Sequence, residues 1–182
     1  MNELRILSRG GQGAVTAAKI LVAAAVAEGK YAQTIPNFGQ ERKGAPVYTF
    51  ARIAEQPILS HTYVYNPDIV VVFDPYIMEL GVDIKQGIKK ETVLVINSPS
   101  LPLALKDSFA KTGCADAWGI TSEVIGNAPP NAAMLGALAK TTNIISIDSL
   151  CQVLSNTLKG PKGEKNAESA QLAYERTVIY GK

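Results

Sequence analysis

A glycine-rich turn near the amino terminus is the first candidate for binding chemistry. In the stretch ILSRGGQGAVTAAKIL, an apolar run is followed by Gly10, Gly11, Gln12 and Gly13, and then by a helical pattern. A turn of this kind gathers backbone N–H groups at the positive end of a helix, where phosphates and carboxylates bind well. The amide of Gln12 can add a hydrogen bond to a ligand or a partner. The pattern therefore predicts an anion-binding turn.

The same turn also has a purely structural interpretation. Its glycines are spaced GGxG rather than GxGxxG, and no acidic residue follows a second strand at the distance that a dinucleotide site requires. Glycine is also needed wherever the backbone adopts a positive φ, or where a helix and a strand approach closely. Taken alone, the turn leaves anion binding and a structural role as open alternatives.

A charged loop, IPNFGQERKGAPVYTF, is the second candidate. Gly39 and Gly44 flank a polar run that contains Arg42 and Lys43. These two cations can meet a phosphate or a carboxylate on a partner, and Phe38 is costly to expose in such a loop. An ordinary solvated loop is the alternative.

Groups that could act as an acid, a base or a nucleophile are scarce. The single histidine, His61, falls in a segment expected to be extended, and we interpret it as a structural or surface residue. Cys114 and Cys151 lie far apart without a CxxC pair, so they predict neither an iron–sulfur nor a zinc site. We interpret both as small buried apolar residues. We therefore expect no catalytic residue and no metal ligand on this chain.

The composition indicates one domain that covers residues 1–182. Apolar residues make up 47% of the chain and charged residues 19%, which suffices for a core of ordinary size. The net charge of +2 is small and its cations are scattered, so a nucleic-acid partner is not expected. The amino terminus lacks the apolar run of a signal peptide, and no stretch reaches the roughly 18 apolar residues of a membrane span. We expect a cytoplasmic protein with reduced thiols and no membrane contact.

The elements that must position these residues follow an α/β pattern. Short apolar runs rich in β-branched residues alternate with segments of helical period, which is typical of helices packed on a buried parallel sheet. We expect a Rossmann-like, mostly parallel sheet with helices on both faces, in three layers, and extra antiparallel strands around residues 46–63. Expected strands are 4–8, 30–34, 46–53, 58–63, 69–73, 91–98, 115–121 and 144–145; expected helices are 13–28, 77–88, 131–140, one that begins near 148, and 167–179.

The stretch NAPPNAAMLGALAK predicts the start of a helix. Two prolines precede Asn131, whose side chain we expect to cap the helix. Met134 and Leu135 are expected in the core, because Met and Leu at helical spacing usually pack there. The later stretch KGPKGEKN is expected to be a flexible basic loop.

Several of these stretches together resemble one family. GGQG, FGQERKGAPV, PDIVVVFDP, VLVINS, NAAMLGALAK and LKGPKGEKNAESAQLAYE are similar, in this order, to the gamma subunit of the 2-oxoacid:ferredoxin oxidoreductases. The matches run from residue 8 to about residue 175, and the first two motifs together are distinctive. In fused pyruvate:ferredoxin oxidoreductases, the corresponding piece is an internal domain.

The resemblance implies a complex that decarboxylates a 2-oxoacid on thiamine diphosphate, passes electrons through iron–sulfur clusters to ferredoxin, and transfers the acyl group to coenzyme A. It also implies that the reverse reaction, reductive carboxylation, is possible in the same family. Thiamine diphosphate, magnesium and the clusters are expected on alpha, beta and delta subunits. This chain lacks the GDG and Asn of a thiamine site and the cysteine sets of clusters. We therefore expect it to bind no cofactor tightly and to be inactive alone.

For this chain, the resemblance implies a role in assembly and in binding coenzyme A as a substrate. Gly10, Gly11, Gln12 and Gly13 would supply hydrogen bonds, and the pair Arg42 and Lys43 would supply positive charge to the phosphates. Family members often carry a second arginine where this chain has Lys43, so a two-arginine clamp is not assumed. The identity of the 2-oxoacid stays open.

Two other readings stay open beside this one. In the first, the chain is an independent nucleotide-binding Rossmann-like protein that uses the glycine turn. In the second, it is an assembly protein whose turn binds nothing. A subunit built for permanent partners should expose apolar area when isolated, and a homodimer would cover some of it.

Overall fold

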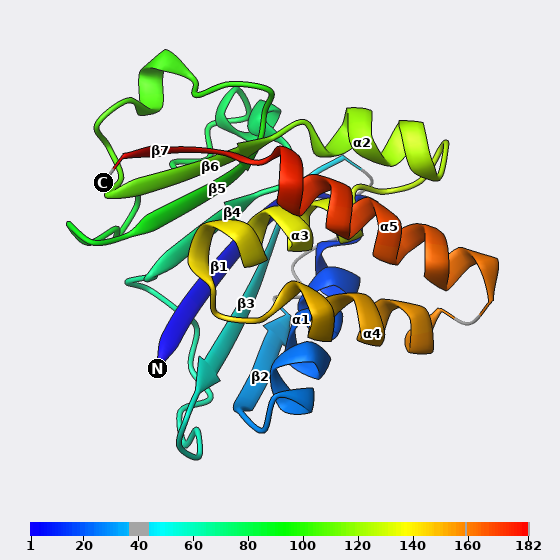
Figure 1. Cartoon of the computed structure of the whole chain (residues 1–182). Helices are drawn as coiled ribbons and strands as arrows, with labels where there is room; N and C mark the ends of the chain where they lie inside the picture. The colour runs from blue at the N-terminus through cyan, green and yellow to red at the C-terminus, as the bar shows by residue number, and fades with distance from the viewer. Residues whose placement is uncertain (37–43, 159, 182) are drawn as a thin grey trace.

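One seven-stranded sheet runs through the part of the chain that the structure, a computed structural model, describes: residues 1–36, 44–158 and 160–181. The strands lie in the order β2-β3-β1-β4-β5-β6-β7 (Figure 1). Their bounds are β1 Asn2–Arg9, β2 Tyr31–Pro36, β3 Pro46–Ala54, β4 Ile69–Val72, β5 Val93–Asn97, β6 Lys111–Ala115 and β7 Val178–Gly181.

The sheet is mixed, with a parallel centre and antiparallel edges. β1, β4, β5 and β6 pair in parallel with their neighbours, whereas β3 is antiparallel to β1, and β7 to β6. Because β2 is antiparallel to β3, it points the same way as β1. Only β3 and β7 therefore oppose the common strand direction. The predicted α/β class and mostly parallel sheet are confirmed, and β3 supplies the expected antiparallel content, whereas residues 55–63 form turns and irregular chain.

The two faces of the sheet are covered differently. On one face pack α1 (Ala14–Ala27), α2 (Ala117–Val124), α3 (Asn131–Thr142), α4 (Ile147–Thr157) and α5 (Pro161–Arg176) (Figure 1). The other face meets two short 3-10 helices, η1 (Pro75–Met78) and η2 (Leu103–Leu105), and irregular chain. Within β4, Val71 faces the helices while Val70 and Val72 face the irregular layer. Helices were expected on both faces of the sheet. Among the described residues, α-helices cover one face only, so this part of the prediction was wrong.

Several element predictions need correction. Residues 77–88 are not a helix but η1 followed by turns, in which Gly81 and Gly87 have φ of 82° and 69°. The strand expected at 115–121 is α2, whose Asp116 side chain caps it by accepting from the Gly119 N–H at 2.9 Å. Residues 144–145 form no strand. Residues 161–166 of the basic stretch predicted as a loop belong to the start of α5, which ends at Arg176 before β7.

The helical layer packs closely around α3. Met134 and Leu135 are buried, as predicted, and α3 lies against both the sheet and α5. A Cβ at Gly136 would collide with the backbone of Ala170 on α5, so glycine permits this close helix contact. Within the described ranges, none of the helices is long and apolar enough to cross a membrane.

Candidate functional site

The glycine turn links the end of β1 to the start of α1. Gly11 and Gly13 have φ of 92° and 76°, a region that favours glycine, so part of the glycine pattern is required by the backbone. The Gly10 N–H donates to the Ala45 carbonyl at 2.9 Å, which ties the turn to the start of β3. Gly13 is the N-cap of α1 and supplies no side-chain cap. The first N–H groups of α1 therefore stay available to another acceptor.

A cleft of about 240 Å³ opens at this turn. It is lined by Gly10, Gly11 and Gly13, by the preceding end of β1, and by the first residues of α1. Within the part of the chain that the structure describes, the N–H groups of Gly11 and Gly13 have no hydrogen-bond partner. Unpaired N–H groups at the positive end of a helix attract an anion. The geometry thus favours the anion-binding alternative without excluding the structural one.

Gln12 points inward and holds the turn in place. Its side-chain carbonyl accepts from the Arg9 N–H at 2.7 Å, and its amide nitrogen donates to the Asp74 carboxylate at 2.6 Å. Only 7% of Gln12 is exposed. Its two side-chain ends are engaged inside the protein, so its observed role is to position the turn.

Asp74, which directly follows Phe73 after β4, organises the base of the turn. The Arg9 guanidinium donates to the same carboxylate at 2.6 Å and lies 5.2 Å from the centre of the Tyr76 ring. Burial by itself raises the pKa of the Asp74 carboxyl, but the Tyr76 N–H, Gln12 and Arg9 together lower it below its ordinary value. A carboxylate anchored in this way keeps Arg9 and Gln12 in fixed positions. No motif in the sequence singled out Asp74, although the end of a buried strand is a common position for functional polar groups.

The predicted site residues are only partly brought together. Gly10, Gly11 and Gly13 line the cleft, and Gln12 lies beneath it. Arg42 and Lys43 lie outside the described residues. The described chain resumes at Gly44, and Pro46 of β3 pairs with Arg9 at the end of β1.

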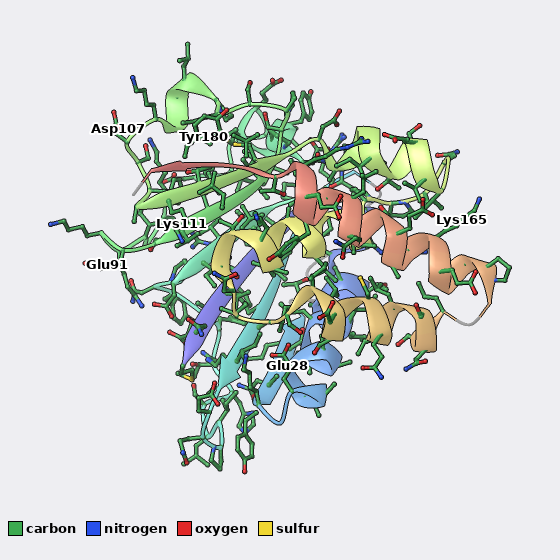
Figure 2. The ribbon with its side chains drawn as sticks, in the orientation of Figure 1. Glu28, Glu91, Asp107, Lys111, Lys165 and Tyr180 are labelled. Carbon is green, nitrogen blue, oxygen red and sulfur yellow. The ribbon has the colours of Figure 1, made fainter. Side chains whose placement is uncertain are left out.

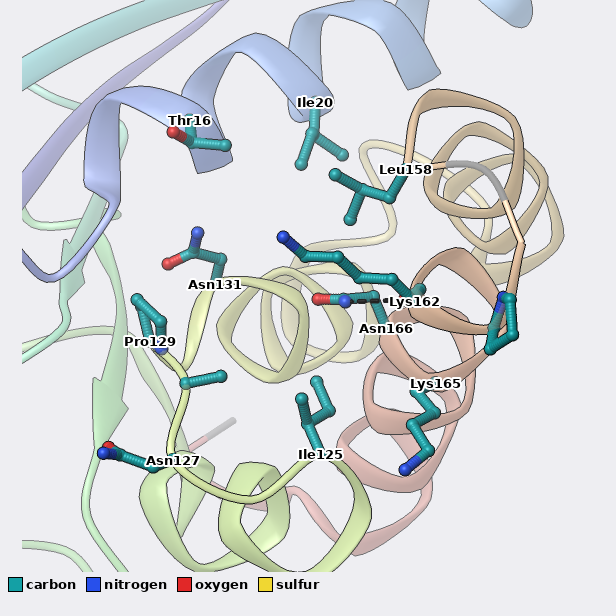
Figure 3. A pocket seen from close by; sticks show the side chains of 12 residues that line it. Thr16, Ile20, Ile125, Asn127, Pro129, Asn131, Leu158, Lys162, Lys165 and Asn166 are labelled. Carbon is teal, nitrogen blue, oxygen red and sulfur yellow. Dashed lines mark hydrogen bonds between the residues drawn. The ribbon is translucent and has the colours of Figure 1, made fainter.

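A second and larger cavity, of about 620 Å³, lies on the helical side of the sheet (Figure 3). It is walled by α1, the loop between α2 and α3, the first residue of α3, and the junction of α4 with α5. Asn131 does not cap α3, which contradicts the prediction: Pro130 is the N-cap, and the Asn131 amide packs against Gly13 instead. No sequence pattern identified this cavity, because its walls come from three segments that lie far apart in the sequence.

The other chemically reactive side chains form no site. His61 is exposed. Burial raises the pKa of the Cys114 thiol to about 11. Burial, and to a smaller extent the negative charge of Asp148, also raises the pKa of the Cys151 thiol. Within the described residues, no group of three or more His, Cys, Asp or Glu is arranged to hold a metal ion.

Comparisons with known proteins agree along nearly the whole chain. A family described as pyruvate ferredoxin/flavodoxin oxidoreductase matches residues 3–176. The common subunit gamma of the pyruvate/ketoisovalerate oxidoreductases of Thermococcus kodakarensis is 44% identical over 184 aligned residues, which cover 99% of each chain. The crystal structure of pyruvate oxidoreductase subunit PORC from Thermotoga maritima is 30% identical, with a TM-score of 0.83 over 98% of this chain and 97% of that one.

A more distant solved structure shares the fold. It is a 2-oxoglutarate:ferredoxin oxidoreductase from Magnetococcus marinus with 2-oxoglutarate, coenzyme A and succinyl-CoA bound. The match has a TM-score of 0.76 at 20% identity and covers 97% of this chain but 31% of that longer one. The gamma-subunit resemblance is thus confirmed by the family match, the sequence relative and the fold. The chain belongs to the pyruvate ferredoxin/flavodoxin oxidoreductase family, as a gamma-type subunit.

Proposed function

We propose that this chain works with alpha, beta and delta subunits in a 2-oxoacid:ferredoxin oxidoreductase, and that its glycine turn receives the phosphates of coenzyme A. In such a complex a 2-oxoacid loses carbon dioxide, its acyl group is joined to coenzyme A, and two electrons pass to ferredoxin. Thiamine diphosphate, magnesium and iron–sulfur clusters belong to the partner subunits. The two cysteines of this chain fit no cluster, and the described residues offer no group of metal ligands.

The proposed contact with coenzyme A rests on the cleft at the glycine turn. Unpaired N–H groups of Gly11 and Gly13 and the uncapped start of α1 meet there. Arg42 and Lys43 come shortly before β3 in the sequence, and β3 begins beside the cleft, where Pro46 pairs with Arg9. Helix N–H groups with nearby cations suit a diphosphate. In the Magnetococcus marinus relative, whose structure holds coenzyme A, a domain of this fold is present.

We propose that the partner subunits determine which 2-oxoacid the complex uses. The Thermococcus kodakarensis relative is described as common to pyruvate and ketoisovalerate oxidoreductases, so one gamma subunit serves two substrates there. This chain contributes assembly and coenzyme A contact instead. We further propose that residues 1–182 act as one domain, that the complex works in the cytoplasm, and that isolated chains pair as homodimers to cover apolar surface.

Val15 offers a sharp test of the cleft. It lies in the first turn of α1 and lines the cleft, so Val15→Asp places a carboxylate where phosphates are expected. Because acidic residues stabilise the first turn of a helix, the change should not weaken the fold. In the reconstituted complex, we expect Val15→Asp to raise the KM for coenzyme A about tenfold or more through charge repulsion, with the KM for the 2-oxoacid unchanged. The isosteric, neutral Val15→Asn is the matched control.

Arg42 is tested in the same assay. Arg42→Ala should raise the KM for coenzyme A, and Arg42→Lys, which keeps the charge but loses the planar fork, should have a smaller effect. Normal assembly with an unchanged KM in both Val15→Asp and Arg42→Ala would refute the coenzyme A contact.

The complex itself is tested by purification of the tagged chain from anaerobic native lysate. We expect thiamine-binding and cluster-binding subunits to co-purify and to show ferredoxin reduction that depends on a 2-oxoacid and coenzyme A. The 2-oxoacid that supports ferredoxin reduction in this assay is the substrate of the complex. A stable chain recovered alone, with saturable binding of NAD or FAD, would favour an independent nucleotide-binding protein instead.

A further inference from the structure

The larger cavity has the size and the lining of a small-molecule site. Its volume of about 620 Å³ lies within the range of roughly 300–1,000 Å³ typical of ligand pockets. Ile20 of α1, Ile125 before α3 and Leu158 after α4 form apolar walls (Figure 3). An apolar ligand body would gain free energy by leaving water for these walls.

Two cations without partners stand at one side of this cavity. Lys162 and Lys165, near the start of α5, both line it, and Lys162 extends across it toward Asn131 (Figure 3). Neither lysine forms an ion pair with any residue that the structure describes. Among the described lining residues none is acidic; Glu164 of the same helical turn is not one of them. The cavity therefore has a positive, unbalanced side.

The position of these lysines in α5 strengthens the case for an anion. Both lie near the amino-terminal end of a 16-residue helix, where the helix dipole is positive and cations are unfavourable. Like charges gathered at this end cost stability in the free chain. A bound anion would reduce that cost, because it would interact favourably with the dipole and with the Lys162 ammonium.

Asn131 adds an oriented amide. Its oxygen is buried with no hydrogen-bond partner among the described residues, because the amide packs against Gly13. Asn131 also lines the cavity, and the side chain of Lys162 extends toward it (Figure 3). Beside them Asn166, only 9% exposed, donates to the Lys162 carbonyl at 2.8 Å and fixes the start of α5. An amide N–H and an ammonium group side by side match the two oxygens of a carboxylate.

We propose that this cavity binds a small amphipathic carboxylate. The carboxylate lies between the Lys162 ammonium and the Asn131 amide, and the apolar body packs on Ile20, Ile125 and Leu158. The site is separate from the cleft at the glycine turn, so it does not depend on whether coenzyme A contacts that turn. Its ligand is recognised by an apolar body and one carboxylate, not by phosphates.

The test uses the full chain and three probes that divide the ligand into parts. 3-Phenylpropionate carries both the apolar body and the carboxylate, 3-phenylpropan-1-ol lacks the charge, and acetate lacks the body. By calorimetry we expect 3-phenylpropionate to bind at one saturable site, and the other two at least about tenfold more weakly, since about 1.4 kcal/mol corresponds to a factor of ten. Methyl NMR should locate the shifts at Ile20, Ile125 and Leu158.

Substitutions separate the charge from the cavity. Lys162→Met keeps the unbranched stem of the side chain but lacks the terminal ammonium, a cation that the helix end disfavours, so the fold should be retained while 3-phenylpropionate binds about tenfold more weakly. Ala128→Trp should fill the cavity and abolish binding of the acid. Lys106→Met, at an exposed lysine beside η2 on the other face of the sheet, is the matched control and should bind as the unchanged chain does.

Three results would overturn the proposal. The first is no saturable binding of 3-phenylpropionate, and the second is equal affinity for the acid and the alcohol in the unchanged chain. The third is binding that is lost when the complex is assembled, which would show that a partner subunit fills the cavity. Retention in the complex, together with the loss in Lys162→Met, supports the carboxylate site.

Discussion

Gly13, the N-cap of α1, lies in contact with Asn131, the first residue of α3. A Cβ atom at position 13 would lie 2.7 Å from Cγ of the asparagine, closer than real carbon contacts allow. One glycine thus forms part of the cleft at the turn and also supports the amide that lines the larger cavity. This pair therefore lies between the cleft and the larger cavity, with Gly13 lining the first and Asn131 the second.

Gly13→Ala should destabilise the fold more than Gly11→Ala. Both glycines have positive φ, which costs about 1–2 kcal/mol for alanine, but only position 13 adds a collision. Overpacking typically costs a further 1–3 kcal/mol or so, and position 11 faces open space. Urea unfolding of both variants measures the difference. Equal losses would show that the contact with Asn131 has no energetic weight.

A double-mutant cycle isolates the pair. Asn131→Ala removes the side chain that alanine at position 13 would strike, so Gly13→Ala should cost less in that background. We expect a coupling free energy of about 1–2 kcal/mol. An additive cycle would assign the whole loss in Gly13→Ala to backbone strain.

The parts of the fold that the sequence predicted are those with a local signal. The run between the prolines in PDIVVVFDP predicted β4, and all four residues of that strand are buried. The glycine turn and the start of α3 after two prolines were also placed correctly. The prediction of a helix at residues 77–88 was wrong. The apolar residues there have helical spacing, but the positive φ of Gly81 and Gly87 prevents a continuous helix. The apolar residues there pack as a loop over the sheet.

The chemistry of the site was harder to predict because it depends on distant pairs. Gln12 was expected to face a ligand, but Asp74, 62 residues away, draws its amide inward. Asn131 was expected to cap a helix, but its amide packs on Gly13. No local pattern encodes either contact. The roles of Arg42 and Lys43 stay predictions, since both lie outside the described residues.

Gln12→Ala should lower stability rather than act first on coenzyme A binding. The change removes hydrogen bonds to the Arg9 N–H and to the Asp74 carboxylate. Hydrogen bonds to charged groups contribute roughly 1.5–3 kcal/mol, so we expect a loss of about 2 kcal/mol in the free energy of unfolding. Chemical denaturation of the isolated chain checks this. A fully stable variant with a raised KM for coenzyme A would assign Gln12 to the ligand instead.

Cys114 should be unreactive in the folded chain. Burial raises the pKa of its thiol from 9.0 to about 11, so the thiolate fraction at pH 8 falls about a hundredfold. We expect iodoacetamide to modify Cys114 at least a hundredfold or so more slowly in the native chain than in urea. Mass spectrometry of timed samples measures the rate. Rapid native labelling of Cys114 would contradict the buried position and reopen the question of a reactive thiol.

Glu28 joins the end of α1 to the start of α4, and Figure 2 shows it between these two helices. Its carboxylate accepts from the Ser146 N–H at 2.6 Å and from the Lys30 ammonium at 2.9 Å. Burial alone would raise the pKa of Glu28, but these hydrogen bonds outweigh it and lower the pKa from 4.5 to about 2. The ionised form is therefore stabilised by folding.

Glu28→Gln should reduce stability in a pH-dependent way. Because the folded pKa is lower than the unfolded one, the contribution of Glu28 is complete above pH 4.5 or so and declines as the pH falls toward 2. We expect a loss of up to about 3 kcal/mol at pH 7, smaller at pH 3. Urea unfolding across this range measures it. Glu168→Gln, at an exposed position of α5, is the control and should show only a small loss of stability. A loss in Glu28→Gln that does not change with pH would mean that the charge of Glu28, as distinct from its shape, does not hold α1 and α4 together.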